Sequence, residues 1–370
     1  MPPTSLVSKP HYPILDGLRG VAALVVVAFH LCEAHATSHL DQVINHGYLA
    51  VDFFFLLSGF VIGYAYDDRW QAMTVGSFFK RRLVRLQPMV VLGMVIGAVL
   101  FYAQTSALWP AIGQTPGWKV LLIMVVGCLM LPVPPALDIR GWNETYPLNG
   151  PGWSLFFEYL ANILYATVVR KFSKLALGIL VFLAAVALVQ LAVTSPAGDV
   201  IGGWSLEPLQ LHIGFARMAY PFFAGLLLFR VAKLRTVNNA FLWCSLLVIA
   251  ALAMPRVGGP QHLWMNGLYD SLSIIFVFPL IVFLGASGEV VTSFSKKLCG
   301  FLGDISYPIY ITHYPLIYTY TAWVQDKKIP WRDALPVAVL VFLLAVGIAY
   351  ACLKFYDEPV RQWLKKKVAV

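Results

Sequence analysis

The sequence predicts an all-α integral membrane protein, and its composition carries that prediction. Of its 370 residues, 59% are hydrophobic and only 12% are charged. A chain of this size with a mean hydropathy of +0.73 has too few polar side chains to cover a water-soluble globule. The apolar character never lapses long enough for a soluble module, so we expect a single transmembrane domain over residues 1–370.

Apolar runs long enough to cross a bilayer recur along the chain, and from them we predict ten membrane-spanning helices. The first run is longer than the core of a signal peptide and contains Arg19, so we keep it as a span. An eleventh run at 120–132 is short and leads into prolines, so we expect a re-entrant or interfacial segment there. The ten predicted spans lie near residues 13–33, 48–66, 86–105, 151–169, 175–193, 209–229, 238–254, 265–286, 299–322 and 333–356.

The basic residues indicate how these spans are oriented. The net charge of +9 is carried by short clusters of Lys and Arg between spans, a pattern that sets topology rather than one that binds nucleic acid. When 120–132 is not counted, most of the 27 basic residues fall on one side. We therefore place both termini in the cytoplasm and the protein in the inner, cytoplasmic membrane. The five cysteines are scattered, so we expect neither a disulfide framework nor a metal site.

Arg19 and His30 are the most informative residues of the first predicted span. Their spacing corresponds to three helical turns and about 16 Å, so both side chains point the same way. Titratable groups at this depth mark chemistry or transport, although a snorkelling Arg and a hydrogen-bonded His are the alternative. We predict that His30 is a general base and that Arg19 holds an anionic or carbonyl-bearing part of a substrate. Glu33 either orients the imidazole of His30 or is solvated.

A basic cluster follows within residues 77–88. Arg81 and Arg85 lie one turn apart on one face of the expected helix, with Arg82 beside them. Guanidinium groups pair well with phosphate oxygens, so this cluster is a candidate for binding the phosphates of a cytoplasmic cofactor. A topology signal in contact with lipid headgroups is the alternative.

Several further polar residues lie in apolar surroundings and are candidates for the active cavity. Glu158 follows a Gly/Pro turn and needs a His, an Arg or a substrate hydroxyl as its partner, so we count it as catalytic. We assign Trp153 and Ser154, which precede it on the same span, to the substrate-binding surface. Asp52 is assigned there too, at the outer end of a span whose Ser58–Gly59 pair indicates close helix packing or a nearby ligand.

The later part of the chain adds two candidates for substrate binding. His313 lies between Pro308 and Pro315, which should kink the span and free backbone carbonyls toward a cavity. It either binds an acceptor sugar or hydrogen-bonds a neighbouring helix. Glu358 is the second candidate; it and Arg217 are either each other's partners or residues of a polar pathway.

Common catalytic motifs are missing from the sequence. It has no zinc-ligand spacing, no phosphate-binding glycine loop and no GxSxG nucleophile pattern. We therefore expect the chemistry to come from buried His, Arg and Glu side chains.

Six blocks of the chain, taken in order, resemble the membrane-bound acyltransferase-3 family. The most specific element is a basic residue followed by ten residues and a His, here Arg19 to His30. The blocks are LDGLRGVAALVVVAFH (15–30), GYLAVDFFFLLSGFVIG (47–63), FFKRRLVRLQP (78–88), NGPGWSLFFEYLANILY (149–165), GDISYPIYITHYPLIY (303–318) and YDEPVR (356–361).

This resemblance implies an activity and a set of site residues. Members of the family move an acyl group, commonly acetyl, from cytoplasmic acyl-CoA to a hydroxyl of a sugar-containing acceptor. It implies that His30 and Arg19 are essential, that Glu158 lies in the active cavity, and that Arg81, Arg82 and Arg85 meet the phosphates of the donor. The chain departs from some relatives at Pro308, and we expect no esterase-like domain after the last span.

We therefore expect an acyl-CoA-dependent O-acyltransferase, with acetyl-CoA as donor, no metal, and a cell-surface polysaccharide or another glycosylated molecule as acceptor. His30 either deprotonates the acceptor hydroxyl or carries the acyl group itself. The alternative is a transporter or flippase for a polysaccharide precursor or a small glycosylated molecule, which should show repeat symmetry. A structural or sensory membrane protein is a third possibility. The sequence does not indicate an oligomeric state.

Overall fold

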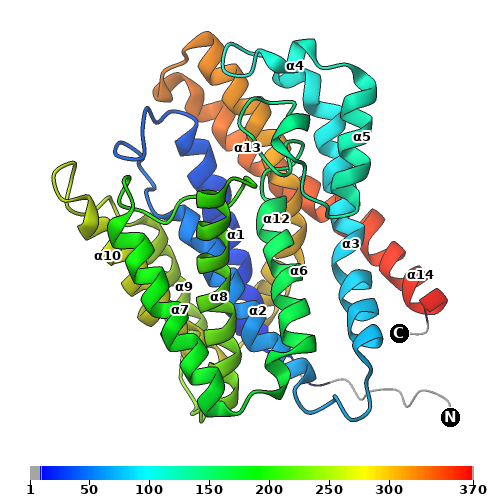
Figure 1. Ribbon diagram of the computed structural model, residues 1–370, viewed down its shortest axis with the longest axis vertical. Helices are drawn as coiled ribbons and strands as arrows, with labels where there is room; N and C mark the ends of the chain where they lie inside the picture. Colours follow the sequence, from blue (N-terminus) through cyan, green and yellow to red (C-terminus); the bar gives the residue numbers. More distant parts are fainter. Residues whose placement is uncertain (1–8, 10, 369–370) are drawn as a thin grey trace.

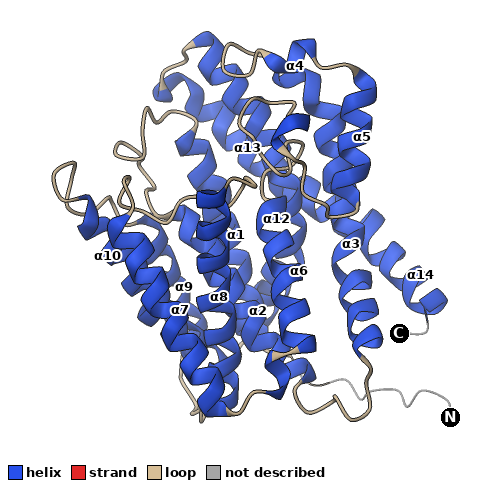
Figure 2. Ribbon diagram, viewed as in Figure 1, coloured by secondary structure: helices blue, strands red, loops and turns tan. Residues whose placement is uncertain are grey.

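A computed structural model describes residue 9 and residues 11–368, and within them the chain is helical and contains no strand (Figure 2). Two π-helical turns, Ser273–Val277 and Leu353–Asp357, interrupt the later helices. The helices are α1 Pro13–Glu33, α2 Ala50–Tyr66, α3 Val75–Leu100, α4 Ala111–Gln114, α5 Gly117–Cys128, α6 Gly152–Thr167, α7 Lys174–Thr194, α8 Pro208–Val231, α9 Ala240–Ala253, α10 Leu263–Leu272, α11 Phe278–Ser287, α12 Ser293–Lys327, α13 Trp331–Cys352 and α14 Glu358–Val368.

Seven segments of the described chain are long and apolar enough to cross a membrane, so the prediction of an all-helical membrane protein is confirmed while the count of ten is not. Of the other three predicted spans, α6 has 16 residues and α9 has 14, or about 24 and 21 Å, which is less than a hydrocarbon core of about 30 Å. The third, α12, is long enough but too polar. The seven segments are Pro13–Glu33, Gly47–Tyr66, Val75–Gln104, Lys174–Thr194, Pro208–Val231, Leu263–Ser287 and Trp331–Lys367.

The apolar stretch at 120–132 forms the short helix α5 and the turn after it. With 12 residues α5 extends about 18 Å, which is too short for a full crossing. It packs against α3 and lies with α4 at one end of the bundle, at the top in Figure 1. A hydrogen bond from the Tyr146 hydroxyl to the Met130 carbonyl, 2.9 Å long, ties the following turn to the connection that leads into α6.

Glycines let the central helices approach closely. A Cβ atom on Gly59 of α2 would lie 1.8 Å from the Phe222 carbonyl oxygen of α8, and one on Gly225 would lie 2.0 Å from the Leu56 carbonyl oxygen. A Cβ atom on Gly20 of α1 would lie 2.3 Å from the Leu302 carbonyl oxygen of α12. The SGF block therefore serves close helix packing, one of the two readings that the sequence left open.

The two prolines of α12 do not open the helix to a cavity as expected. The helix continues through both Pro308 and Pro315. Pro315 has no N–H to offer the Ile311 carbonyl. The side-chain amide of Asn149, from the connection before α6, donates to that oxygen instead at 2.8 Å. The freed carbonyl thus serves to attach the connection before α6 to α12.

The contact between α2 and α8 generates a stability prediction. Gly59→Ala should lower the free energy of unfolding by about 1–3 kcal/mol, because its methyl group would force the two backbones apart. Thermal unfolding in detergent measures the effect. Gly178→Ala on α7 is the control, because a Cβ atom there meets nothing within 4 Å. Equal melting temperatures for the two variants would contradict the close-packing role.

Candidate active site

The structure contains two cavities that share part of their walls. The inner cavity, of about 90 Å³, is lined by Arg19, Arg82, Arg85 and Glu158, among others. The outer cavity, of about 810 Å³, has His30 in its wall. Val51 of α2 and Tyr310 of α12 line both cavities. Arg19 and His30 of α1 therefore belong to different cavities that meet at these two side chains.

The buried carboxylate of the inner cavity has a defined partner. Glu158 Oε1 accepts a hydrogen bond from Arg82 Nη2 at 2.6 Å and another from Ser58 Oγ at 3.2 Å. The side chains of Arg82 and Glu158 are only 8% and 16% exposed, so water does little to weaken this ion pair. Arg82 thus positions Glu158. An arginine was one of the three kinds of partner that the sequence left open for this carboxylate.

Arg19 and the other two arginines of the predicted cluster, Arg81 and Arg85, differ in how firmly they are bound. Arg19 Nη1 lies 3.5 Å from Asp16 Oδ1, one turn earlier on α1, which is a long contact for an ion pair. Arg85 is exposed, lines the inner cavity and forms no hydrogen bond or ion pair within the described chain. Arg81 is half-buried and lies outside both cavity walls. Arg19 and Arg85 are consequently the guanidinium groups most available to an anionic ligand.

His30 is held by the carboxylate of Glu33. Its Nδ1 lies 2.7 Å from Glu33 Oε2, and both residues line the outer cavity. An ionised carboxylate only accepts hydrogen bonds, so this contact assigns the proton to Nδ1 and leaves Nε2 free to accept one. Of the two roles considered for Glu33, the structure supports orientation of the imidazole.

His313 packs against the ring of His30 and does not line either cavity. The two imidazole rings stack with centroids 5.7 Å apart. His313 Nδ1 donates to the backbone carbonyls of Ile309 and Tyr310, at 2.9 and 3.0 Å, so its hydrogen bonds go to its own helix. This corrects the expectation of a bond to a neighbouring helix. The described structure offers His313 no direct route to an acceptor.

Two of the predicted substrate-binding residues lie in the cavity walls. Trp153 lines the outer cavity, where its ring lies 5.3 Å from the guanidinium carbon of Arg217. Ser154, the next residue, lines the inner cavity, and its hydroxyl oxygen is 2.6 Å from the hydroxyl of Tyr310. The start of α6 thus contributes one side chain to each cavity.

The other two predicted substrate-binding residues lie outside both walls. Asp52 is fully buried and pairs with Arg217, with Nη2 and Oδ2 2.6 Å apart. Glu358 pairs with Lys354, one turn earlier at the π-helical turn before α14. The suggestion that Arg217 and Glu358 are partners was therefore wrong. The sequence could not identify the right partner, because residues far apart in sequence pair only when their helices are neighbours in the fold.

The sequence analysis missed most of the aromatic wall of the outer cavity. Three of these rings come from the connections 106–150 and 194–208, where the abundance of Trp was the available signal, and the others come from helices. Sugar rings stack well on such aromatic faces, while the phenol and indole groups hydrogen-bond hydroxyls. The aromatic residues of this wall are Phe29, Tyr48, Trp109, Trp142, Trp153, Trp204, Tyr310, Tyr314 and Tyr318.

Glu144 is a second carboxylate of the outer cavity that the sequence analysis did not select. Its carboxylate accepts from the Tyr318 hydroxyl at 2.8 Å. The guanidinium of Arg140 lies 3.5 Å from it and also stacks on Tyr318, 3.6 Å from the ring centre. Burial raises the pKa of Glu144 to about 7, and Arg140 only partly opposes this rise.

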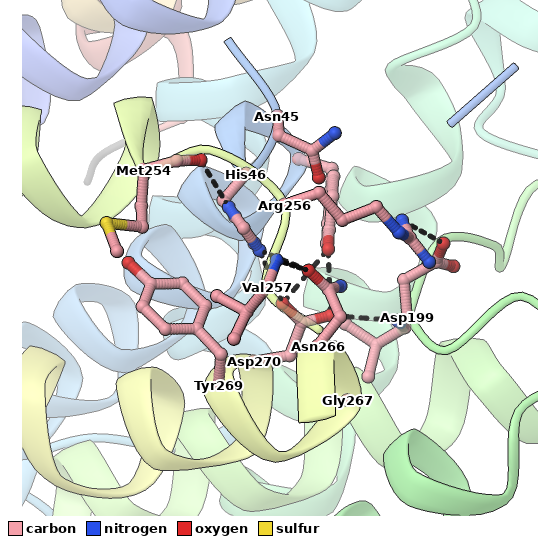
Figure 3. Close-up of polar contacts among 12 residues, drawn as sticks. Asn45, His46, Asp199, Met254, Arg256, Val257, Asn266, Gly267, Tyr269 and Asp270 are labelled. Carbon is pink, nitrogen blue, oxygen red and sulfur yellow. Dashed lines mark hydrogen bonds and ion pairs between the residues drawn. The ribbon is translucent and has the colours of Figure 1, made fainter. Parts of the chain in front are cut away.

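A buried polar network ties α10 to connections that lie far from it in the sequence (Figure 3). The ring of His46 hydrogen-bonds the Met254 carbonyl at 2.7 Å and the side chain of Asn266 at 2.9 Å. Asn266 also donates to the Gly198 carbonyl, and Asp270 accepts from the Val200 N–H. The network therefore joins three connections to α10, and two of them carry cavity-lining residues, His39 and Ile201 among them.

A helical membrane bundle in which an arginine-lined cavity adjoins one with an imidazole–carboxylate pair offers the charged and proton-accepting groups that group transfer uses. The chain matches a model of an acyltransferase domain over residues 12–354, and it belongs to the acyltransferase-3 family. The family expected from the sequence is thereby confirmed. No group of three or more His, Cys, Asp or Glu side chains that could hold a metal occurs within the described residues.

Curated relatives include enzymes that transfer acyl groups. The peptidoglycan O-acetyltransferase OatA of Listeria monocytogenes is 25% identical over 97% of this chain, which spans 57% of that protein. The O-acetyltransferase OatA of Staphylococcus aureus is 26% identical over 96% of this chain, which spans 58% of it. Acyltransferase MdmB of Streptomyces mycarofaciens is 31% identical over 43% of this chain and 40% of its own length. No solved structure gives a significant match.

The raised pKa of Glu144 generates a prediction for the pH dependence of stability. A carboxyl group whose pKa is higher in the folded than in the unfolded state stabilises the fold at acidic pH, and this contribution is lost as the pH rises through about 7. The melting temperature of the wild type should therefore fall more between pH 5 and pH 8 than that of Glu144→Gln, which remains neutral. Parallel pH profiles of the two proteins would contradict the prediction.

Proposed function

We propose that this protein is an integral-membrane O-acyltransferase that moves an acetyl group from cytoplasmic acetyl-CoA to a hydroxyl of a sugar-containing acceptor. The observation that carries the proposal is the position of His30. Its ring is oriented by Glu33 in a cavity large enough for a sugar, and that cavity adjoins one lined by arginines. Membership of an acyltransferase family supports the same reaction type.

The inner cavity is proposed to receive the head of the donor from the cytoplasmic side. The clusters of basic residues favour that side for both termini. Arg19 and Arg85 line the cavity, Arg19 with a long 3.5 Å contact to Asp16 and Arg85 with no ion pair within the described residues, so they can pair with the phosphates of coenzyme A. Arg82 and Glu158 neutralise each other. We assign this pair to shaping the cavity, through the hydrogen bonds that Glu158 accepts from Arg82 and Ser58. The pantetheine arm would extend toward Tyr310.

The outer cavity is proposed to bind the acceptor. Its aromatic walls suit the faces of sugar rings, and Glu144, His35 and His39 provide polar groups for hydroxyls. An acceptor reached from this side would be a sugar of the cell surface. The Listeria relative is named as a peptidoglycan O-acetyltransferase, which supports a glycan acceptor of this kind.

In this proposal His30 Nε2 takes the proton from the acceptor hydroxyl as that oxygen forms a bond to the thioester carbon. The tetrahedral intermediate then collapses, the carbon–sulfur bond breaks, and the imidazolium returns the proton to the departing thiolate. Glu33 stabilises the imidazolium through its contact with Nδ1. Attack by Nε2 itself, which would give an acyl-imidazole, uses the same geometry.

The central test is replacement of His30. His30→Ala should abolish nearly all transfer of labelled acetyl from acetyl-CoA to cell-surface glycan while leaving donor binding intact, because Arg19 and Arg85 remain. His212→Ala is the control, since His212 is exposed on α8 and lies outside both cavities. If His30→Ala keeps wild-type turnover, or if the purified protein moves glycan without consuming acetyl-CoA, the proposal is wrong; the second result would indicate a flippase.

The proposed phosphate contact predicts a separate kinetic effect. Arg85→Ala should raise the KM for acetyl-CoA about tenfold or more with little change in kcat, because a charge-assisted hydrogen bond contributes about 1.5–3 kcal/mol. Arg81→Ala is a matched control from the same helix, because its side chain lies outside both walls. Equal KM values for the two variants would remove Arg85 from the donor site.

A further inference from the structure

Tyr310 lies at the junction of the two cavities. It lines both of them, and the only other described residue that does so is Val51, whose side chain carries no polar atom. Tyr310 is one helical turn before His313, which stacks on His30. If the donor occupies the inner cavity and the acceptor the outer one, the thioester carbonyl must reach this junction. Tyr310 then provides a hydroxyl at that junction.

The hydrogen bonds of Tyr310 show where its proton lies in the absence of substrate. The hydroxyl oxygen of Ser154 is 2.9 Å from the Pro151 carbonyl oxygen and 2.6 Å from the hydroxyl oxygen of Tyr310. A carbonyl oxygen can only accept, so the single hydroxyl proton of Ser154 goes to Pro151. Tyr310 therefore donates to Ser154.

The phenol ring of Tyr310 is held by packing, but the side chain remains accessible from the cavities. Tyr310 is 8% exposed, and its ring packs edge-on against Phe54 with centroids 5.4 Å apart. Because the hydroxyl proton rotates about the C–O bond, it can leave Ser154 for another acceptor without movement of the ring. A pre-positioned donor of this kind needs little reorganisation when negative charge develops beside it.

We propose that the Tyr310 hydroxyl is the oxyanion donor of the transfer reaction, an inference that rests on the proposed function. As the acceptor oxygen attacks the thioester carbon, the carbonyl π electrons move onto the carbonyl oxygen. The Tyr310 hydroxyl turns from Ser154 to donate to this oxyanion. When the carbonyl re-forms, the carbon–sulfur bond breaks, the thiolate takes the proton from His30, and Tyr310 donates to Ser154 again. No proton leaves Tyr310 in this cycle.

Tyr310→Phe tests the proposal because it removes the hydroxyl and keeps the ring. We expect kcat to fall about 10²–10³-fold, as for the loss of one oxyanion donor, with both KM values within about threefold of the wild type. Tyr220→Phe is the matched control. Tyr220 is 5% exposed, donates to the Ile275 carbonyl at 3.1 Å and lies outside both cavities.

The outcomes separate this inference from the proposed function. If the wild type and Tyr220→Phe both lack turnover, the proposed function is wrong and this inference fails with it. If both are active and Tyr310→Phe matches them, only the role of Tyr310 is wrong. A change confined to KM, or unchanged kcat with faster acetyl-CoA hydrolysis in the absence of acceptor, would mean that the residue only closes the junction and would also overturn the proposal.

A second replacement keeps the test valid if Tyr310→Phe folds poorly. Introducing 3-fluorotyrosine at position 310 preserves the shape and hydroxyl of the residue but makes the phenol more acidic. An oxyanion donor should then give a changed kcat with unchanged melting temperature and unchanged KM values. Identical kcat for the fluorinated and unmodified proteins would contradict the proposal.

Discussion

Charged side chains inside an apolar bundle are tolerated only when each finds a partner, because no water is present to solvate them. Asp52 with Arg217 and Glu158 with Arg82 meet this requirement across pairs of helices, at 2.6 Å in both cases. Each pair fixes the register of the helices that carry it, since a shift of one turn would leave both charges unpaired. The side chains left without such a partner are correspondingly the ones available for a ligand.

Close backbone packing makes these pairings possible. Gly59 and Gly225 bring α2 and α8 into contact, and the same two helices carry Asp52 and Arg217. Ser58, beside Gly59, extends in the other direction to Glu158 on α6. The SGF block is thus a packing element whose neighbouring residues support both cavities. The motif therefore contributes to the inner cavity in two ways, through the close helix contact at Gly59 and through the hydroxyl of Ser58.

The two cavities divide the proposed reaction between two sets of side chains. Flexible arginines line the smaller one, as suits a donor that is recognised by charge. Aromatic rings line the larger one, as suits an acceptor that is recognised by shape, and a network of buried hydrogen bonds joins connections that carry some of its lining residues (Figure 3). The residues that line both cavities are Val51 and Tyr310 within the described chain. In the proposed reaction, transfer at this junction would keep the thioester away from bulk water, which would otherwise hydrolyse it.

The sequence by itself determined the fold class and the family and singled out His30, Arg19 and Glu158 as candidate site residues, because apolar runs and isolated polar residues within them are local patterns. It also indicated Glu33, which lies one turn from His30 on the same helix. The tertiary structure alone decided that Arg82 pairs with Glu158, that Asp52 and not Glu358 pairs with Arg217, and that Tyr310 adjoins both cavities. These relations depend on which helices are neighbours and how each is rotated, and hydropathy does not encode either. Helix geometry links residues three or four positions apart, whereas partners separated by more than a hundred positions are fixed only by packing.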